Sequence, residues 1–197
     1  MKKIILIALI TIVVLFSLSV YFGSFTMSNY FNRNQTAVVK EIIALNRLET
    51  ASFSIEKIIE AGTAGNSLQN ILFGDKILLI AHGQVIAGFD LSKVITEDID
   101  VSGKILNMKL PSPEILVTKL DGEKTRVYDR KLGWLTKGDP NLETETRIVA
   151  EHEIRQAACE SGILEAASEN LRKQLVAMFQ SAGFEEVNLN IAKGECK

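Results

Sequence analysis

The stretch KILLIAHGQVIAGFD (residues 76–90) contains two apolar runs separated by the dipeptide His82-Gly83, and it sets the expected fold. A dipeptide ending in glycine between two such runs is typical of a tight β-hairpin turn. Two more dipeptides of this kind, Ser102-Gly103 and Asp121-Gly122, separate further strand-like runs. The sequence therefore predicts a β-sheet built largely from three antiparallel hairpins.

Upstream of this stretch, apolar and polar residues alternate over residues 48–60, which predicts a strand. Residues 61–70 (AGTAGNSLQN) lack any periodicity and are expected to form a loop. Thr36 is a candidate N-cap for a helix that precedes the strand. Between the first two hairpins, Asp90 or Ser92 is expected to cap a single helical turn.

Downstream of the hairpins, the pattern changes to the helical period. Asp139-Pro140 is typical of a helix start, and a helix is expected to about Glu160, followed by a break at Ser161-Gly162. A second, strongly amphipathic helix should run to Gly183, and residues 184–191 alternate like a strand. The sequence therefore predicts an α+β fold, with an antiparallel, hairpin-rich sheet covered by C-terminal helices.

The N-terminus resembles a membrane-spanning segment. No charged residue occurs from Ile4 to Phe22, and nineteen helical residues span roughly 28 Å, which matches a bilayer core. A cleaved signal peptide is the alternative. The aromatic and apolar residues that continue to Phe25 favour a retained anchor.

The basic residues predict the orientation of this anchor. Lys2 and Lys3 precede it, whereas the next basic residue is Arg33, so the N-terminus is expected in the cytoplasm. We therefore expect residues 1–27 to be a transmembrane signal anchor and residues 28–197 a single extracytoplasmic domain in the cell membrane. That remainder carries a net charge of −4, so attachment to the membrane should rest on the helix alone.

The composition excludes several classes of protein. Among 197 residues, 47% are hydrophobic and only 3 are Pro, which argues against disorder. The net charge of −2 gives no basic field to hold a phosphate backbone, so nucleic acid is not an expected partner.

Catalytic motifs are scarce in this chain. The sequence has two histidines and no GxSxG, HExxH, P-loop or GxGxxG pattern. His152 stands between Glu151 and Glu153, where carboxylates could hold a proton or help to bind a cation, but consecutive helical residues point in different directions. His82 is expected in a turn. We expect no cofactor and no metal site.

Cys159 and Cys196 are the only cysteines. The helix that begins near residue 163 travels about 30 Å and the final strand returns about 26 Å, so the C-terminal tail could lie near Cys159. In an oxidising compartment the two would form a disulfide. A buried, inert Cys159 with a free thiol in the tail is the alternative.

Two further groups of residues have alternative interpretations. Asp90, Glu97, Asp98 and Asp100 lie close enough in sequence to bind Ca²⁺ or Mg²⁺, but they also fit ordinary caps and turns. Trp134 is either a buried anchor between sheet and helix or an exposed aromatic that contacts a partner or a membrane surface.

Four stretches taken together carry a family resemblance: LETASFSIEKIIEAG (48–62), GQVIAGFDLS (83–92), KLPSPEIL (109–116) and YDRKLGW (128–134). From about Ala37 to Ile191 the chain resembles bacterial single-pass membrane proteins that share an uncharacterised domain of unknown function. The resemblance implies a bacterial origin, an N-terminal anchor and one exported domain. It brings no functional residues with it.

These observations favour a non-enzymatic binding or assembly module at the cell envelope, acting on an envelope protein or on a second copy of itself as a homo-oligomer. One alternative is a hydrolase or transferase with a nonstandard site around His152. Another is a domain that binds an apolar ligand such as a lipid.

Overall fold

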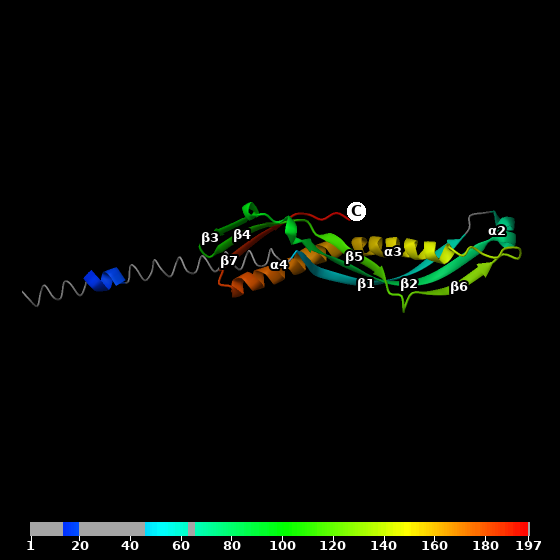
Figure 1. The fold of residues 1–197 in the computed structure, drawn as a ribbon, viewed down its shortest axis with the longest axis horizontal. Helices are drawn as coiled ribbons and strands as arrows, with labels where there is room; N and C mark the ends of the chain where they lie inside the picture. Colours follow the sequence, from blue (N-terminus) through cyan, green and yellow to red (C-terminus); the bar gives the residue numbers. More distant parts are fainter. Residues whose placement is uncertain (1–13, 20–45, 63–65, 197) are drawn as a thin grey trace, which may run out of the picture.

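Two very long strands run along most of the length of the domain. The computed structural model describes residues 14–19, 46–62 and 66–196. Strands β1 (Arg47–Gly62) and β2 (Asp75–Asp90) have 16 residues each and pair antiparallel along almost their whole length. At roughly 3.3 Å per residue each spans about 50 Å. The protein is elongated along this pair (Figure 1).

The predicted hairpin at His82-Gly83 is wrong, because β2 passes straight through both residues. Alternate side chains of β2 stay buried on both sides of this dipeptide, from Ile77 to Phe89. Gly83 is needed for packing and not for a turn. A Cβ atom at this position would lie 2.9 Å from Cδ1 of Ile154, which packs against the strand from a helix.

The predicted hairpin at Asp121-Gly122 is also wrong. Strands β5 (Glu114–Leu120) and β6 (Arg126–Leu132) do not pair with each other; both pair antiparallel with β2, one along each half of it. Residues 121–125 form an excursion between them. The backbone N–H of Asp121 and the hydroxyl of Thr125 both donate to the carbonyl oxygen of His82, at 2.8 and 3.1 Å, which keeps the two strands in line.

A second, smaller sheet contains the hairpin that the sequence predicted correctly. Strands β3 (Ile99–Ser102) and β4 (Ile105–Leu110) pair antiparallel around Gly103, whose φ is +62°. The final strand, β7 (Glu186–Ile191), is confirmed as a strand but pairs parallel with β4. This sheet is therefore mixed. The antiparallel main sheet and the C-terminal helices confirm the α+β class.

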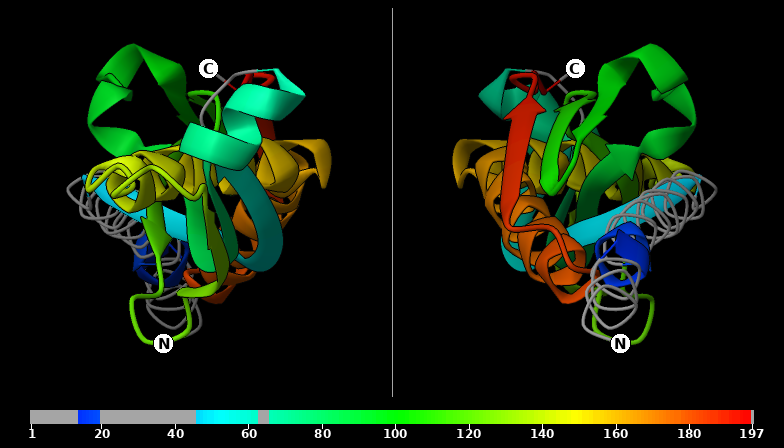
Figure 2. Two further views of the ribbon diagram at one scale, coloured as in Figure 1. Left: turned by 90° about the vertical axis from the view of Figure 1, so that its right-hand side faces the viewer. Right: turned by 90° about the vertical axis from the view of Figure 1, so that its left-hand side faces the viewer.

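Two successive helices cover one face of the main sheet. They are α3 (Leu142–Glu160) and α4 (Ile163–Ser181), and the predicted break between them is confirmed at Gly162. Figure 2, right, looks onto the end where α4 and β7 face the viewer. The core joins both sheets to both helices; its members include Leu79, Val85, Phe89, Leu106, Met108, Ile154, Ala158, Leu171, Leu175, Phe179 and Leu189.

A β-bulge in β1 connects the main sheet to α4. The pairing of β1 with β2 shifts register between Glu49 and Ala51, which leaves Thr50 as the extra residue. Its hydroxyl donates to the carbonyl of Ala167 at 3.0 Å, and its carbonyl accepts from the side chain of Asn170 at 2.8 Å. The backbone carbonyl of the bulged residue is thus satisfied by a side chain of the helix.

The expected N-terminal anchor falls mostly outside the described residues. Residues 14–19 are helical, with exposed Val14, Leu15, Phe16 and Leu18. Across the described parts of the chain, no helix is both long and apolar enough to span a membrane. The helix expected after Thr36 lies outside the described residues up to residue 45. Arg47, which was expected at its end, is the first residue of β1.

Candidate functional site

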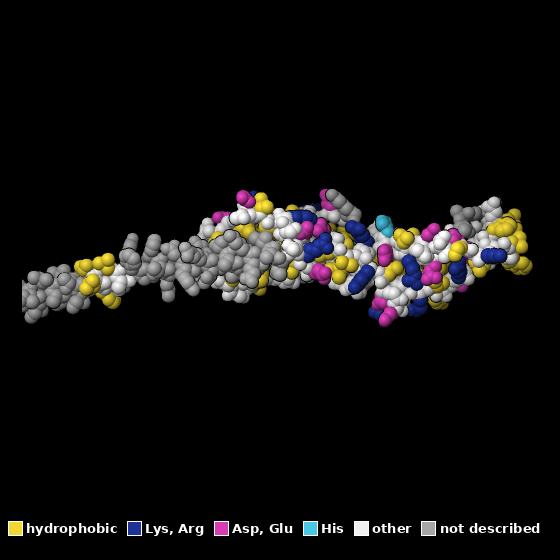
Figure 3. All heavy atoms as spheres, in the orientation of Figure 1, with side chains coloured by type: hydrophobic (Ala, Val, Ile, Leu, Met, Phe, Trp, Pro, Cys, Tyr) yellow, Lys and Arg dark blue, Asp and Glu magenta, His cyan; other side chains and the backbone are white. Residues whose placement is uncertain are grey.

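Large apolar side chains are exposed together at one end of the long sheet. Figure 3 shows them gathered at the right-hand end of the molecule, over α2 (Ser67–Phe73), and Figure 2, left, looks onto this end with α2 nearest the viewer. Each of them is between 39% and 89% exposed. We call this surface the apolar tip; its residues are Leu68, Ile71, Leu72, Phe73, Leu132, Trp134 and Leu135.

The apolar tip is built from two segments that are far apart in sequence. The backbone N–H groups of Gly133, Trp134 and Leu135 donate to the carbonyls of Gly74, Ile71 and Leu72, at 2.7, 3.2 and 2.8 Å. The segment after β6 therefore lies directly against the C-terminal end of α2. Only glycine fits at position 133, because a Cβ atom there would lie 2.7 Å from the backbone of Leu72.

The short helix α2 corrects the predicted loop over residues 61–70. Asn66 and Gln69 form a reciprocal capping box, in which the N–H of Gln69 donates to the side chain of Asn66 at 2.9 Å and the N–H of Asn66 donates to the side chain of Gln69 at 3.3 Å. The Asn-x-x-Gln spacing was a usable signal for a helix start. Leu68, Ile71 and Leu72 follow it at the spacing of one helical face.

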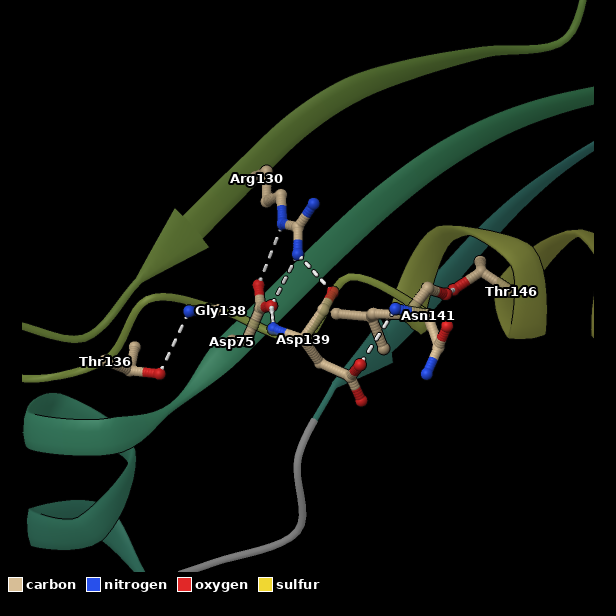
Figure 4. Close-up of polar contacts among 8 residues, drawn as sticks. Asp75, Arg130, Thr136, Gly138, Asp139, Asn141 and Thr146 are labelled. Carbon is tan, nitrogen blue, oxygen red and sulfur yellow. Dashed lines mark hydrogen bonds and ion pairs between the residues drawn. The ribbon is translucent and has the colours of Figure 1, made fainter.

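An ion pair between buried Asp75 and partly exposed Arg130 holds the loop behind the tip (Figure 4). Asp75, at the start of β2, is 1% exposed and accepts from Nε and Nη2 of Arg130 at 3.1 and 2.7 Å. It also accepts from the backbone N–H of Asp139, at 2.7 Å, while Arg130 donates to the carbonyl of Asp139 at 2.7 Å. This clasp fixes β2, β6 and the loop that leads into α3 to one another.

The charge of Asp75 is stabilised by this arrangement. The hydrogen bond from Arg130 lowers the pKa of Asp75 below its ordinary value, against the opposing effect of burial, and the backbone N–H of Asp139 adds to the lowering. A bidentate, charge-assisted pair of this kind is rigid. Both oxygen atoms of the Asp75 carboxylate accept hydrogen bonds from within the protein. We therefore interpret the clasp as a structural support for the tip.

Trp134 is 89% exposed in the apolar tip, so it is an exposed aromatic residue and not a buried anchor between sheet and helix. It is the only tip residue among those that the sequence singled out. Glycine and turn residues around it gave no indication that α2, sixty residues upstream, would lie beside it. The other tip residues were not recognised because their neighbours in space come from different parts of the chain.

The side chains of Glu151, His152 and Glu153 point in two different directions. Glu151 and His152 line a shallow hollow between α3 and β5, together with Ile148, Val117 and Arg155. Glu153 points instead toward β1, where its carboxylate lies 3.3 Å from Nζ of Lys57. The three side chains do not converge on one point. Within the described residues, His152 makes no hydrogen bond or ion pair.

His82 and the acidic residues near Asp90 have local partners. Nε2 of His82 lies 3.1 Å from a carboxylate oxygen of Glu56 on the neighbouring strand. Asp90 caps the 3-10 turn Leu91–Lys93 by accepting from the N–H of Ser92, as predicted. In the ranges that the structure describes, no three His, Cys, Asp or Glu side chains gather closely enough to hold a metal ion.

The two cysteines lie away from the tip, near the middle of the domain's length, where α3 ends and the C-terminal tail lies beside it (Figure 1). Cys159, in the last turn of α3, forms a disulfide with Cys196, and their Cα atoms are 6.1 Å apart. The C-terminal tail reaches α3 because β7 runs back beside β4 after α4 has travelled away, as Figure 1 shows. The bond closes a loop that contains the whole of α4 and β7.

The described chain is thus an elongated α+β domain with one buried core that joins both sheets to both helices, and with an exposed apolar surface at one end. It belongs to the family described as Protein of unknown function (DUF4230), whose model matches residues 40–189. No curated protein and no solved structure matches it significantly.

Proposed function

We propose that this protein is a single-pass, membrane-anchored module that projects outside the cytoplasm and binds its target through the apolar tip, without catalysing a reaction. The observation that carries the proposal is the exposure of seven large apolar side chains at one end of the sheet. A soluble domain rarely leaves so many of them together in water unless the patch is a contact surface.

Two further features support the location in this proposal. Residues 4–22 have the length and composition of a membrane span, with Lys2 and Lys3 directly before it and no basic residue after it until Arg33. The disulfide between Cys159 and Cys196 fits an oxidising compartment, because the cytosol keeps such thiols reduced. Both features are consistent with a domain exported through a signal anchor.

The stability of the tip supports its use as a contact surface. Three backbone hydrogen bonds hold its two segments together, and the Asp75–Arg130 clasp fixes the strands that lead into it. The exposed side chains are therefore presented on a fixed backbone, which reduces the entropy that binding must overcome. Trp134, the most exposed of them, belongs to the residue type that most often dominates binding energy at interfaces.

A photocrosslinking experiment tests the proposal. A photoreactive phenylalanine derivative replaces Trp134 in the full-length chain, and a matched version replaces Ile148, which is 63% exposed on α3 outside the tip. In intact membranes we expect a discrete adduct, with lipid or with protein, from position 134 only. Equal labelling from both positions, or none from position 134, would show that the tip is not a binding surface.

A further inference from the structure

We infer that the apolar tip inserts into a lipid bilayer, and into a different bilayer from the one that holds residues 4–22. The inference rests on the proposed function, since it names the partner of the same surface. It makes the protein a tether between two membranes. Four properties of the tip and of the long sheet support it.

The tip is free of charge over both of its segments. Residues 61–74 and 132–136 contain no Asp, Glu, Lys or Arg, although 23% of the whole chain is charged. A protein-docking surface typically surrounds its apolar centre with polar and charged groups that select the partner. A surface that enters hydrocarbon must exclude charge, because a charged side chain in the bilayer is costly.

Several backbone groups of the tip are hydrogen-bonded to one another across its two segments. The C-terminal carbonyls of a helix normally lack partners, but those of Ile71, Leu72 and Gly74 accept from the segment that follows β6. The N–H of Gly74 donates in turn to the carbonyl of Asn70 at 3.0 Å. Unpaired backbone groups are what exclude most loops from lipid, so this pairing prepares the tip for a nonpolar phase.

Lysines border the second of the two uncharged segments in sequence. Lys131 directly precedes the tip residue Leu132, and Lys137 follows Leu135 by two positions. Both side chains are exposed, and long basic side chains at such a border extend toward phosphate groups. Trp134 has the amphipathic ring that is enriched at the boundary between headgroups and acyl chains.

The direction of the long sheet separates the tip from the anchor. The chain enters β1 at Arg47, and the tip follows the other end of that strand, about 50 Å away at roughly 3.3 Å per residue. The segment that joins the proposed anchor to the domain is therefore attached at the remote end. A domain oriented in this way points its tip away from the membrane in which it is anchored.

The sole Trp of the chain makes the inference directly measurable. The full-length protein is reconstituted into nanodiscs and mixed with acceptor vesicles of phosphatidylcholine whose acyl chains carry bromine, a short-range quencher of indole emission. We expect loss of most Trp134 emission and a shift of the remainder to shorter wavelength. Because the tip is uncharged, the quenching should persist in high salt, where electrostatic adsorption would be lost.

Two variants control this measurement. Leu135→Asp places a charge in the tip and should abolish quenching, whereas Ile148→Asp places the same charge on exposed α3 and should leave quenching unchanged. Both positions are exposed, so both variants should unfold at the wild-type temperature, which is checked by circular dichroism. Loss of quenching in Leu135→Asp alone supports insertion of the tip.

The outcomes that contradict the inference are distinct from those that contradict the proposed function. If the protein enters nanodiscs but acceptor vesicles do not quench Trp134, the tip does not insert, and a protein-only crosslink from position 134 would then identify a protein-docking surface. Quenching only by brominated lipid placed in the nanodiscs themselves would show insertion into the anchoring membrane and overturn the tether. Failure to associate with nanodiscs at all would refute the anchor.

Discussion

The two ends of the described domain use the same kinds of side chain in opposite ways (Figure 1). At one end, Phe179 of α4 is fully buried and meets Phe184 edge to face, with ring centroids 5.9 Å apart. At the other end, Phe73 and Trp134 are 56% and 89% exposed. Phe179 and Phe184 are buried and so contribute to the free energy of folding. The exposed rings of Phe73 and Trp134 contribute little to it. The difference separates residues kept for stability from residues available for binding.

The largest expected effect comes from breaking the buried end. Phe179→Ala should lower the free energy of unfolding by about 4 kcal/mol, because it removes a buried aromatic ring and leaves a cavity. Urea denaturation measures the change. Phe73→Ala is the matched control at the tip and should cost less than about 1 kcal/mol, since its ring is largely in water. Equal losses would contradict the division between the two ends.

The disulfide, which lies between the two ends, provides the next largest effect. Replacing both Cys159 and Cys196 by serine should lower the free energy of unfolding by about 3 kcal/mol, because a loop closed across 37 positions becomes free in the unfolded chain. Reductant should destabilise the wild-type protein to the same extent and leave the double variant unaffected. A wild-type protein that is insensitive to reductant would show that the bond does not form.

The clasp beneath the tip should have a smaller effect that depends on pH. Asp75→Asn should lower the free energy of unfolding by about 2 kcal/mol at neutral pH, since it removes the charge from the hydrogen bonds to Arg130. The pKa of Asp75 is lower in the folded protein than its ordinary value near 3.8. Its ionisation therefore stabilises the fold above that value, and the contribution is lost as the pH falls through the lowered pKa.

A pH series of urea denaturations measures this difference between wild type and variant. The gap should be constant near neutral pH and should close in acid. Asp129→Asn is a suitable control, because Asp129 lies 3.7 Å from Lys131 in an exposed pair of little energetic weight. A gap that persists unchanged in strong acid would mean that Asp75 does not act through its charge.

The elements that sequence predicted well are those whose pattern is set locally. The helices on either side of Gly162 and the final strand follow from periodicity and from glycine at a helix boundary. Periodicity does not specify a neighbour, however. The parallel pairing of β7 with β4 depends on where α4 ends in space, and that is decided by packing.

The errors in the sheet have a common physical cause. Gly83 resembles a turn residue in sequence, but its missing side chain accommodates Ile154 from a helix seventy residues further along. Asp121-Gly122 does form a local turn, yet β2 is long enough to pair with the strands on both sides of it. In both cases a contact or strand pairing distant in sequence overrides the local turn signal. The apolar tip was missed for the same reason, since four of its seven residues come from α2 and the other three from the end of β6 and the segment after it.

The smallest change in global stability should come from Gly133→Ala, which tests whether the tip is held together as the structure indicates. The new Cβ atom would lie 2.7 Å from the backbone of Leu72, so the segment must move away from α2. We expect a loss of about 1 kcal/mol or less in the free energy of unfolding, because the strain is released by local opening. Hydrogen exchange at the N–H groups of Trp134 and Leu135 should nevertheless accelerate.

Gly122→Ala is the matched control, because a Cβ atom at Gly122 meets no other atom within 4 Å. It should leave exchange at Trp134 and Leu135 at the wild-type rate. If Gly133→Ala also left that exchange unchanged, the pairing of the two tip segments would be wrong. If exchange accelerates, the same variant should insert less well into acceptor vesicles, since the opened N–H and carbonyl groups would enter lipid without partners. Global stability would then depend little on the backbone hydrogen bonds of residues 133–135, whereas membrane insertion would require them.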